Sequence, residues 1–120
     1  MFKIEGDKIH ITRGDKGTIE LSIEGYTFKP EDKIELRIYK KKGLKELPIQ
    51  EKEVKVQEEA SSVDIELTSK DTKIGDIVNQ KTEYWYEIEL NDEQTVVGFD
   101  EEGAKILMLY PEGADADDTM

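Results

Sequence analysis

The 120-residue chain contains no cysteine and only one histidine. Without cysteine it can build neither a disulfide framework nor a thiolate zinc site, and this composition suits a reducing compartment. The sequence also has no calcium-loop spacing, dinucleotide fingerprint or phosphate loop. We therefore predict that the protein binds no cofactor and no structural metal ion.

Long apolar segments are missing as well. The longest unbroken apolar run is Ile106–Tyr110, which is far too short to span a bilayer. The first residues carry charges, among them Lys3 and Glu5, and include no apolar stretch of the kind that a signal peptide needs. The sequence predicts a soluble protein that is made in the cytoplasm and has no membrane partner.

Basic residues are too few to balance the acidic ones. The 17 Lys and Arg residues against 29 Asp and Glu residues give a formal net charge of −12. This charge repels nucleic acid and anionic membrane surfaces, so neither is an expected partner. The acidic excess is typical of a solvated surface that resists self-association, and the alternative is a surface that docks onto a basic partner.

Apolar and polar residues alternate along most of the chain, which is the pattern of strands with one buried and one solvent-facing side. The clearest alternating sets are Ile19–Ile23, Ile34–Ile38, Val63–Leu67 and Tyr84–Leu90. Further strands are expected at Lys8–Thr12, Leu47–Val56, Gln94–Asp100 and Ala104–Tyr110, with a short edge strand at Phe2–Ile4 that turns at Gly6 and Asp7.

Two details of this pattern lead to local predictions. Within Leu47–Val56 the apolar residues change parity, so a bulge is expected near Gln50–Glu53, and Pro48 favours a position at a sheet edge. The segment Thr68–Gly75 has residues that can cap and end a single helical turn.

Seven or eight short strands with turn residues between them predict an all-β fold, a single immunoglobulin-like antiparallel β-sandwich over residues 1–111. The remaining residues, 112–120, are acidic and lack periodicity, so we expect them to form a disordered C-terminal tail.

The sequence offers little for catalysis. The only histidine, His10, lies between Ile9 and Ile11 and should face solvent from the opposite side of its strand. The serines have no nucleophile-elbow motif around them, and no pair among the 29 acids is singled out by its spacing. We predict that the protein is not an enzyme and has no catalytic residues.

Some apolar residues stand on the face that the alternation assigns to solvent. Trp85 shares its face with glutamates, so it is covered by lysine stems, or is a core tryptophan of opposite parity, or is a contact residue. The last strand, "KILMLY", is apolar on both faces. We predict that Trp85, Phe99, Leu107 and Leu109 contribute to a protein–protein contact.

The tripeptide Arg13-Gly14-Asp15 stands between two expected strands. In an extracellular protein it can be an integrin ligand, but a structural turn suits a chain without a secretion signal. We expect Gly14 to supply an unusual backbone angle, Asp15 to accept from backbone N–H groups, and Arg13 to hold a carboxylate in a forked pair.

The segments that begin at this turn carry a family resemblance. They are "KIHITRGDKGTIELSI", "GYTFKPEDKIELRIYKK", "ELTSKDTKIG", "YWYEIEL" and "TVVGFDEEGAKILMLYPEG". In these segments a strand precedes Thr12–Asp15, the next strand ends before Tyr26 and Phe28, and a turn at Pro30-Glu31-Asp32 leads into a third strand. Over most of its length the chain resembles small structural proteins of phages and prophages of Gram-positive hosts, including the N-terminal domain of the baseplate upper protein of siphophage tails.

The resemblance implies an immunoglobulin-like sandwich with a structural role, since in the baseplate family this domain anchors an oligomer to the tail. It predicts a noncatalytic assembly protein of a phage or prophage tail or baseplate, made in the cytoplasm and then carried in the virion or a phage-like particle. Expected partners are other phage structural proteins, further copies of the chain, or both. The alternative is a β-sandwich that binds carbohydrate or a cell-surface ligand, with Trp85 and Tyr39 as its aromatic candidates.

Overall fold

The computed structural model describes residues 1–40 and 47–113, which contain nine β-strands and no helix. The strands are β1 (Phe2–Glu5), β2 (Lys8–Thr12), β3 (Gly17–Leu21), β4 (Lys33–Tyr39), β5 (Gln50–Lys55), β6 (Val63–Leu67), β7 (Thr82–Leu90), β8 (Gln94–Val97) and β9 (Lys105–Tyr110). The predicted all-β class is therefore confirmed. Within the described residues, no helix is long and apolar enough to cross a membrane. Most of the predicted tail, residues 114–120, lies outside the described residues.

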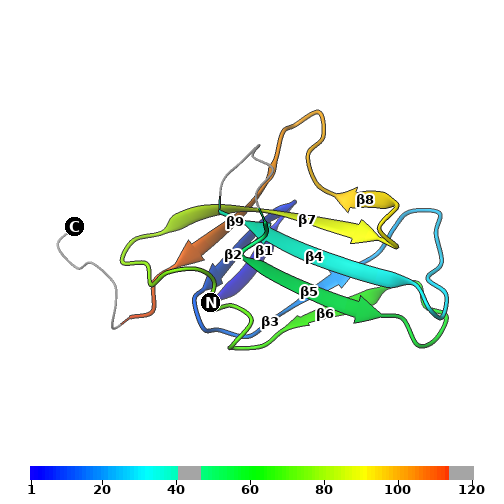
Figure 1. The fold of residues 1–120 in the computed structure, drawn as a ribbon, viewed down its shortest axis with the longest axis horizontal. Coiled ribbons are helices and arrows are strands. Elements are labelled where there is room, and N and C mark those ends of the chain that lie inside the picture. The colour runs from blue at the N-terminus through cyan, green and yellow to red at the C-terminus, as the bar shows by residue number, and fades with distance from the viewer. Residues whose placement is uncertain (41–46, 114–120) are drawn as a thin grey trace.

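The strands form two sheets (Figure 1). The larger sheet has the order β1-β2-β9-β7-β4-β5, with β8 also paired to β7, and the smaller sheet consists of β3 and β6. Three strands are shorter than predicted: β3 ends at Leu21 and β8 ends at Val97, and β5 begins only at Gln50. The short N-terminal strand turns at Gly6 and Asp7 as expected.

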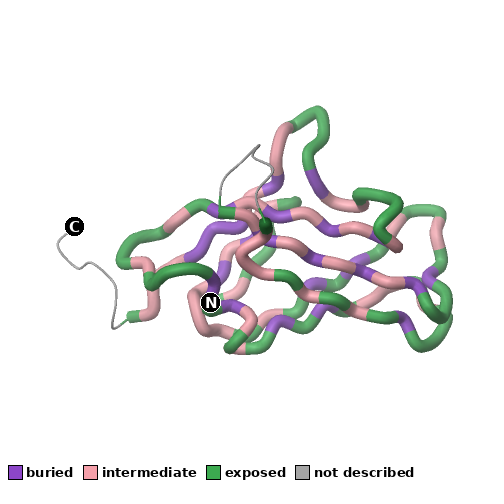
Figure 2. Tube along the Cα trace, viewed as in Figure 1, coloured by how far each residue is buried: buried purple, intermediate pink, exposed green. Residues whose placement is uncertain are grey.

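The hydrophobic core gathers the inward side chains of both sheets. Ile34, Leu36 and Ile38 of β4 are almost fully buried, and so are Ile19 and Ile65 from the smaller sheet. Figure 2 shows buried and less buried positions alternating along the strands. Burying one such aliphatic side chain contributes roughly 1.5–3 kcal/mol, so the alternation in the sequence fixes which face of each strand turns inward.

One strand pair is not antiparallel. β2 and β9 run parallel, with Ile9 opposite Leu107 and Ile11 opposite Leu109, whereas the other strand pairs in the described residues are antiparallel. The prediction of a wholly antiparallel sandwich is wrong at this position. A parallel pair requires a long connection, and here most of the chain lies between β2 and β9. A local sequence pattern therefore cannot predict this pairing.

The predicted bulge near Gln50–Glu53 is also wrong. β5 forms an edge of the larger sheet, as Pro48 suggests, and it pairs with β4 in unbroken register. Its inward positions include Gln50, whose Nε2 donates to the Asp71 carbonyl at 2.8 Å, and Lys52, whose Nζ lies 2.8 Å from Asp71 Oδ2. Because these polar side chains find partners at the sheet edge, no extra residue is needed to restore the apolar face.

The predicted helical turn at Thr68–Gly75 is a hydrogen-bonded turn without a helix. The Thr68 amide donates to Asp71 Oδ2 at 2.9 Å, and the Asp71 amide donates back to Thr68 Oγ1 at 3.1 Å. The capping signal in the sequence is therefore used, but only one i→i+4 bond follows, from the Thr72 amide to the Thr68 carbonyl at 3.2 Å.

Candidate functional site

The Arg13-Gly14-Asp15 tripeptide is locked into a turn by the segment after β6. The Gly14 amide donates to Thr72 Oγ1 at 3.0 Å, and Ser69 Oγ donates to the Gly14 carbonyl at 2.6 Å. Thr72 Oγ1 donates in turn to the Asp15 carbonyl at 2.7 Å. Gly14 has a φ of +89°, which other residues adopt at a cost. The tripeptide thus fastens the β2–β3 connection to the β6–β7 connection.

Arg13 does not make the forked pair that the sequence suggests. Its Nη2 donates to the Gly75 carbonyl at 3.4 Å, and no ion pair of Arg13 with a carboxylate occurs within residues 1–40 and 47–113. Its Nε is buried and has no hydrogen-bond partner there. The predicted forked pair with a carboxylate is wrong because the turn directs the Arg13 guanidinium towards the backbone carbonyl of Gly75.

His10 lies on the outward face of β2, opposite Ile9 and Ile11 as predicted, but neighbouring strands cover it. Its side chain is only 12% exposed. Nδ1 lies 2.8 Å from the Tyr110 hydroxyl on β9, and Nε2 lies 3.0 Å from Glu5 Oε1 on β1. The histidine therefore links three adjacent strands, and the expectation of a solvent-facing side chain is wrong.

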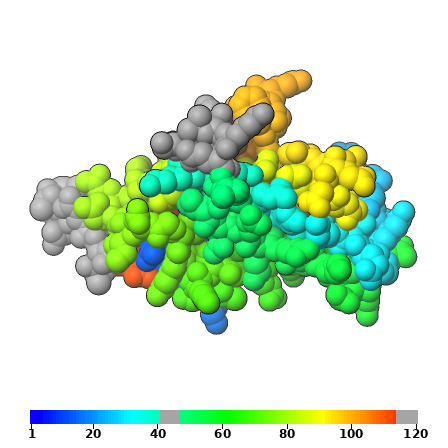
Figure 3. Space-filling view, viewed as in Figure 1, coloured from blue at the N-terminus to red at the C-terminus, as the bar shows by residue number. Residues whose placement is uncertain are grey.

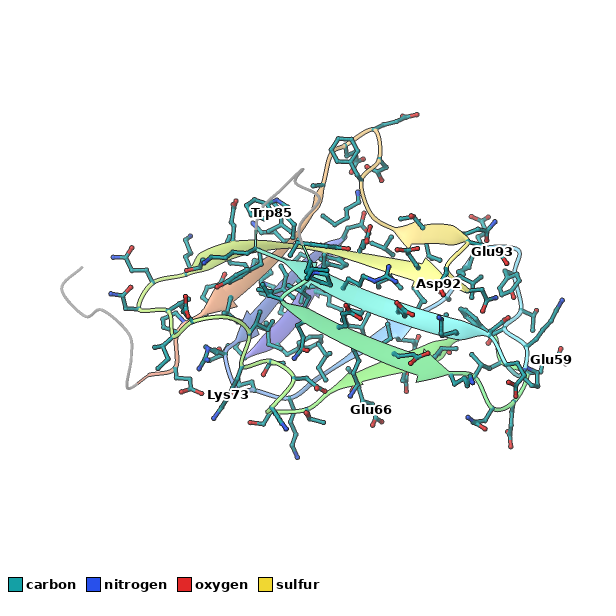
Figure 4. The ribbon with its side chains drawn as sticks, in the orientation of Figure 1. Glu59, Glu66, Lys73, Trp85, Asp92 and Glu93 are labelled. Carbon is teal, nitrogen blue, oxygen red and sulfur yellow. The ribbon has the colours of Figure 1, made fainter. Side chains whose placement is uncertain are left out.

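Trp85 lies on the outward face of the larger sheet, between the buried Tyr84 and Tyr86. This placement excludes the core tryptophan of opposite parity. Trp85 is half-buried and stands directly opposite Tyr39 on β4 and Ile106 on β9. Figure 4 shows it on the side of β7 that is turned away from β3 and β6. The three side chains form an apolar row across three strands.

Leu107 and Leu109 are not surface residues. Both are 0% exposed and belong to the hydrophobic core, so they offer no area to a partner. The prediction that Leu107 and Leu109 form part of a protein–protein contact is therefore wrong. The outward-facing residues of β9 are Ile106, Met108 and Tyr110. Periodicity cannot decide which of two apolar faces turns inward when the strand lies in the middle of a sheet.

A charged cluster that sequence reasoning missed lies on the outward face over β4 and β7. Arg37 of β4 is paired with Glu35 and Glu89, and its guanidinium also lies 3.7 Å from Glu87 Oε1 and 3.4 Å from Asp92 Oδ1. Glu35 stands two positions before Arg37 on β4, but the glutamates of β7 reach Arg37 through cross-strand register, because Arg37 stands opposite Glu87 in the β4–β7 pair. The cluster neutralises part of a carboxylate-rich face.

Phe99 is 76% exposed on the connection between β8 and β9. We call residues 98–104 the acidic loop, since Asp100, Glu101 and Glu102 follow the phenylalanine. The loop stands away from both sheets in Figure 1 and forms the orange protrusion in Figure 3. It closes on itself, because the Asp100 and Gly103 amides each donate to the carbonyl of the other at 3.2 and 2.9 Å.

Lys105 braces the base of the acidic loop. Its side chain is 7% exposed, and Nζ lies 2.9 Å from Asp100 Oδ2 and 3.2 Å from Asp7 Oδ2. The hydrogen bond from Lys105 lowers the pKa of Asp100 below its ordinary value, and the same bond raises the pKa of Lys105. The Tyr86 hydroxyl donates to the Asp7 carbonyl at 2.5 Å. The loop is therefore tied to the β1–β2 turn and to β7.

Two shallow hollows flank the acidic loop. One of about 340 Å³ is lined by residues that include Glu5, Lys8 and Glu102, and one of about 160 Å³ is lined by residues that include Val97 and Asp100. Acidic side chains border both. Among the described residues, no group of three or more His, Cys, Asp or Glu side chains is arranged to hold a metal ion.

Comparison with known proteins gives no relative: no family model, no curated protein and no solved structure matches the chain.

Proposed function

We propose that the protein is a noncatalytic structural protein of a phage or prophage particle, associated with the tail or baseplate, and that it acts through protein–protein contacts. The observation that carries the proposal is Phe99, an exposed aromatic side chain on a loop that Lys105 holds in place. An aromatic side chain that is ordered before binding is suited to anchor an interface, since little conformational entropy is lost on association.

The residues that carry the family resemblance support this proposal by their structural roles. Gly14 and Asp15 hold the β2–β3 turn, and Asp32 of the Pro30-Glu31-Asp32 turn accepts three hydrogen bonds. Such residues specify a scaffold and leave the surface to make contacts. The outward row of Tyr39, Trp85 and Ile106 adds a second apolar area on the larger sheet.

We also infer that the two-sheet fold has immunoglobulin-like topology. In that topology strands C, F and G form one sheet, to which a further strand C′ can be added, and strands B and E are neighbours in the other sheet. The order β2-β9-β7-β4-β5 against β3-β6 fits this scheme. Nuclear Overhauser contacts between Ile9 and Leu107, in a parallel pattern, are expected in solution, and an antiparallel pattern would contradict the assignment.

The function is tested in the host from which the chain comes. Prophages are induced, particles are purified on a density gradient, and the protein is quantified by mass spectrometry against the tail proteins. We expect a constant ratio to the tail proteins across the particle fractions. A protein that stays in the soluble fraction, with no copies in the particles, would refute the particle role.

A carbohydrate-binding module is the second candidate, because Tyr39 stands directly opposite Trp85 on the outward face. Paired aromatic side chains on a sheet face provide a surface on which a sugar ring can stack. Glycan-array binding that is lost in Trp85→Ala and kept in Phe99→Ala would favour this candidate. An array without binding by the unmodified protein would count against it.

A further inference from the structure

Trp85 and Tyr39 form an aromatic pair on the outward face of the larger sheet. The two residues stand directly opposite each other in the β4–β7 pair, and side chains in such positions start about 5 Å apart. The described residues contain two ring–ring contacts, and neither includes Trp85 or Tyr39. The faces of the two rings are therefore not used on other aromatic side chains in this part of the protein.

Carboxylates flank Trp85 along its own strand. Side chains two positions apart in a strand point to the same face and lie about 7 Å apart, so Glu83 and Glu87 stand on either side of the tryptophan. Glu83 is exposed and has no ion pair within residues 1–40 and 47–113. Glu87 accepts a hydrogen bond of 2.6 Å from the Tyr39 hydroxyl. The aromatic pair thus has an acidic side chain on each side.

The hydrogen bond to Glu87 also holds Tyr39 in place. Burial, followed by this bond, raises the pKa of Tyr39 to about 12, so the phenol keeps its proton at neutral pH. The ring stays neutral, and its position relative to the carboxylate is set before any ligand arrives. A side chain that is ordered in advance loses little conformational entropy on binding.

Arg37 neutralises this area only in part. Among the described residues, it is the only base paired with either glutamate beside Trp85, and its Nη1 lies 3.7 Å from Glu87 Oε1. The same guanidinium is held more closely by Glu35 and Glu89. Its single positive charge is therefore shared among several carboxylates, and the area keeps negative charge.

Two exposed lysines near the ends of β4 and β7 do not change this balance. Lys40 directly follows Tyr39, so the alternation of the strand assigns it to the opposite face. Lys81 has the parity of Trp85 but stands four positions away, about 13 Å along an extended chain. Charges at that separation are largely screened at the ionic strength of a cell. Within the described residues, the aromatic pair thus belongs to a locally negative surface.

We propose that Trp85, Tyr39 and the adjacent carboxylates bind a positively charged side chain, arginine above all, from a basic segment of a partner protein. This inference rests on the assembly role proposed above and names the chemistry of the partner. A cation is attracted to the face of an aromatic ring, most strongly to that of tryptophan. Arginine suits the site best, because its planar guanidinium can stack on a ring and donate hydrogen bonds to a carboxylate.

Charge decides between the possible occupants of this surface. The net charge of −12 attracts a basic partner and opposes the approach of a second copy. A neutral sugar ring could stack on the same aromatic side chains but would form no ion pair with Glu83 or Glu87. The dependence of binding on the charge of the ligand therefore separates this proposal from the carbohydrate candidate.

A tetra-arginine peptide that is blocked at both ends tests the site. Its control is a tetra-citrulline peptide, which has the same length and nearly the same shape but no charge. Trp85 is the only tryptophan of the chain, so its fluorescence reports on binding at this surface. We expect tetra-arginine to cause a saturable change in emission at about 0.05 M salt and to bind several-fold more weakly at about 0.5 M salt. Tetra-citrulline should cause no saturable change.

Isothermal titration calorimetry extends the test to variants. Trp85→Leu keeps an apolar side chain but removes the ring, and it should bind tetra-arginine about fivefold more weakly or worse. Glu83→Gln should weaken binding about two- to fivefold. The matched control is Glu59→Gln, which removes one exposed charge that lies far from Trp85 in Figure 4 and should bind like the unmodified protein.

Thermal melts establish that each variant is folded, and Glu83→Gln, at an exposed position, carries the test if Trp85→Leu is not. The proposal is overturned if tetra-arginine does not bind, if tetra-citrulline binds equally well, if folded Trp85→Leu keeps full affinity, or if Glu83→Gln and Glu59→Gln lose affinity equally. A protein that is present in particles but does not bind tetra-arginine keeps its particle role and makes its contacts elsewhere. Binding of tetra-arginine by a protein that is absent from particles would contradict the particle role alone.

Discussion

The hydroxyl of Tyr26 donates a hydrogen bond of 2.6 Å to the carboxylate of Asp32. The same carboxylate accepts from the Lys29 amide at 2.9 Å and from Asn91 Nδ2 at 3.0 Å, and Asp32 is 9% exposed. The bond from Tyr26, followed by those from Asn91 and Lys29, lowers the pKa of Asp32 below its ordinary value of 3.8. Asp32 thus joins the β3–β4 connection to the turn after β7.

Asp32→Asn should destabilise the protein by about 2 kcal/mol at neutral pH, because an amide cannot accept all the hydrogen bonds that the carboxylate accepts. The pKa of the folded state is lower than that of the unfolded state, so this stabilisation is present above the ordinary pKa and is lost as pH falls through the folded pKa. Urea unfolding should show a constant difference between the two proteins from about pH 5 to 7, closing below about pH 4. The exposed neighbour Glu31, changed to Gln, serves as the control, and a difference that persists in acid would point to packing.

Lys105→Gln should lower the melting temperature and loosen the acidic loop. The substitution leaves the Asp7 and Asp100 carboxylates facing each other without the ammonium group that lies 3.2 and 2.9 Å from them. Hydrogen exchange should accelerate at the amides of residues 100–103 more than at β4. Lys81→Gln, at an exposed position, is the matched control; equal exchange in the two variants would show that Lys105 does not brace the loop.

How far the sequence predicts the fold depends on whether a strand has one buried face. β4, β6 and β7 alternate strictly, and the structure has them at the expected places. β9 is apolar on both faces, so periodicity could not tell that Leu107 is core and Ile106 is outward. The parallel β2–β9 pair and the Lys52–Asp71 ion pair depend on residues far apart in sequence, and only the folded chain brings them together.

The candidate surface residues were predictable from the sequence only where they interrupt the alternation of apolar and polar residues. Phe99 and Trp85 break the local pattern, and both were found from that break. The charged cluster around Arg37 was not, because Glu87, Glu89 and Asp92 stand 50 or more positions after Arg37 and reach it only after folding.

Arg37→Gln should destabilise the protein more than Arg37→Lys does. Arg37 is 19% exposed and holds Glu35 and Glu89 with two different nitrogens, a geometry that one ammonium group cannot reproduce. We expect a loss of about 1–3 kcal/mol for Gln, since the part-buried carboxylates are then left without their hydrogen-bond donor. Urea unfolding at about 1 M salt should narrow this loss, because salt screens the remaining repulsion. A loss that is independent of salt and equal for both substitutions would assign the role of Arg37 to packing of its stem.

Gly17→Ala should destabilise the protein through a collision with Phe2. A Cβ on Gly17 would lie 2.6 Å from Phe2 Cγ and Cε2, closer than side chains approach, so the Phe2 ring or the strand that carries it must shift. We expect a cost of about 1–3 kcal/mol. In the Phe2→Ala background the same substitution should cost clearly less, because the ring is gone, and the double-mutant cycle measures this coupling. Gly113→Ala is the control, since a Cβ there meets no atom within 4 Å. Additive effects of Gly17→Ala and Phe2→Ala would mean that the ring does not pack on Gly17 in solution and that β1 is held by its hydrogen bonds to β2 alone.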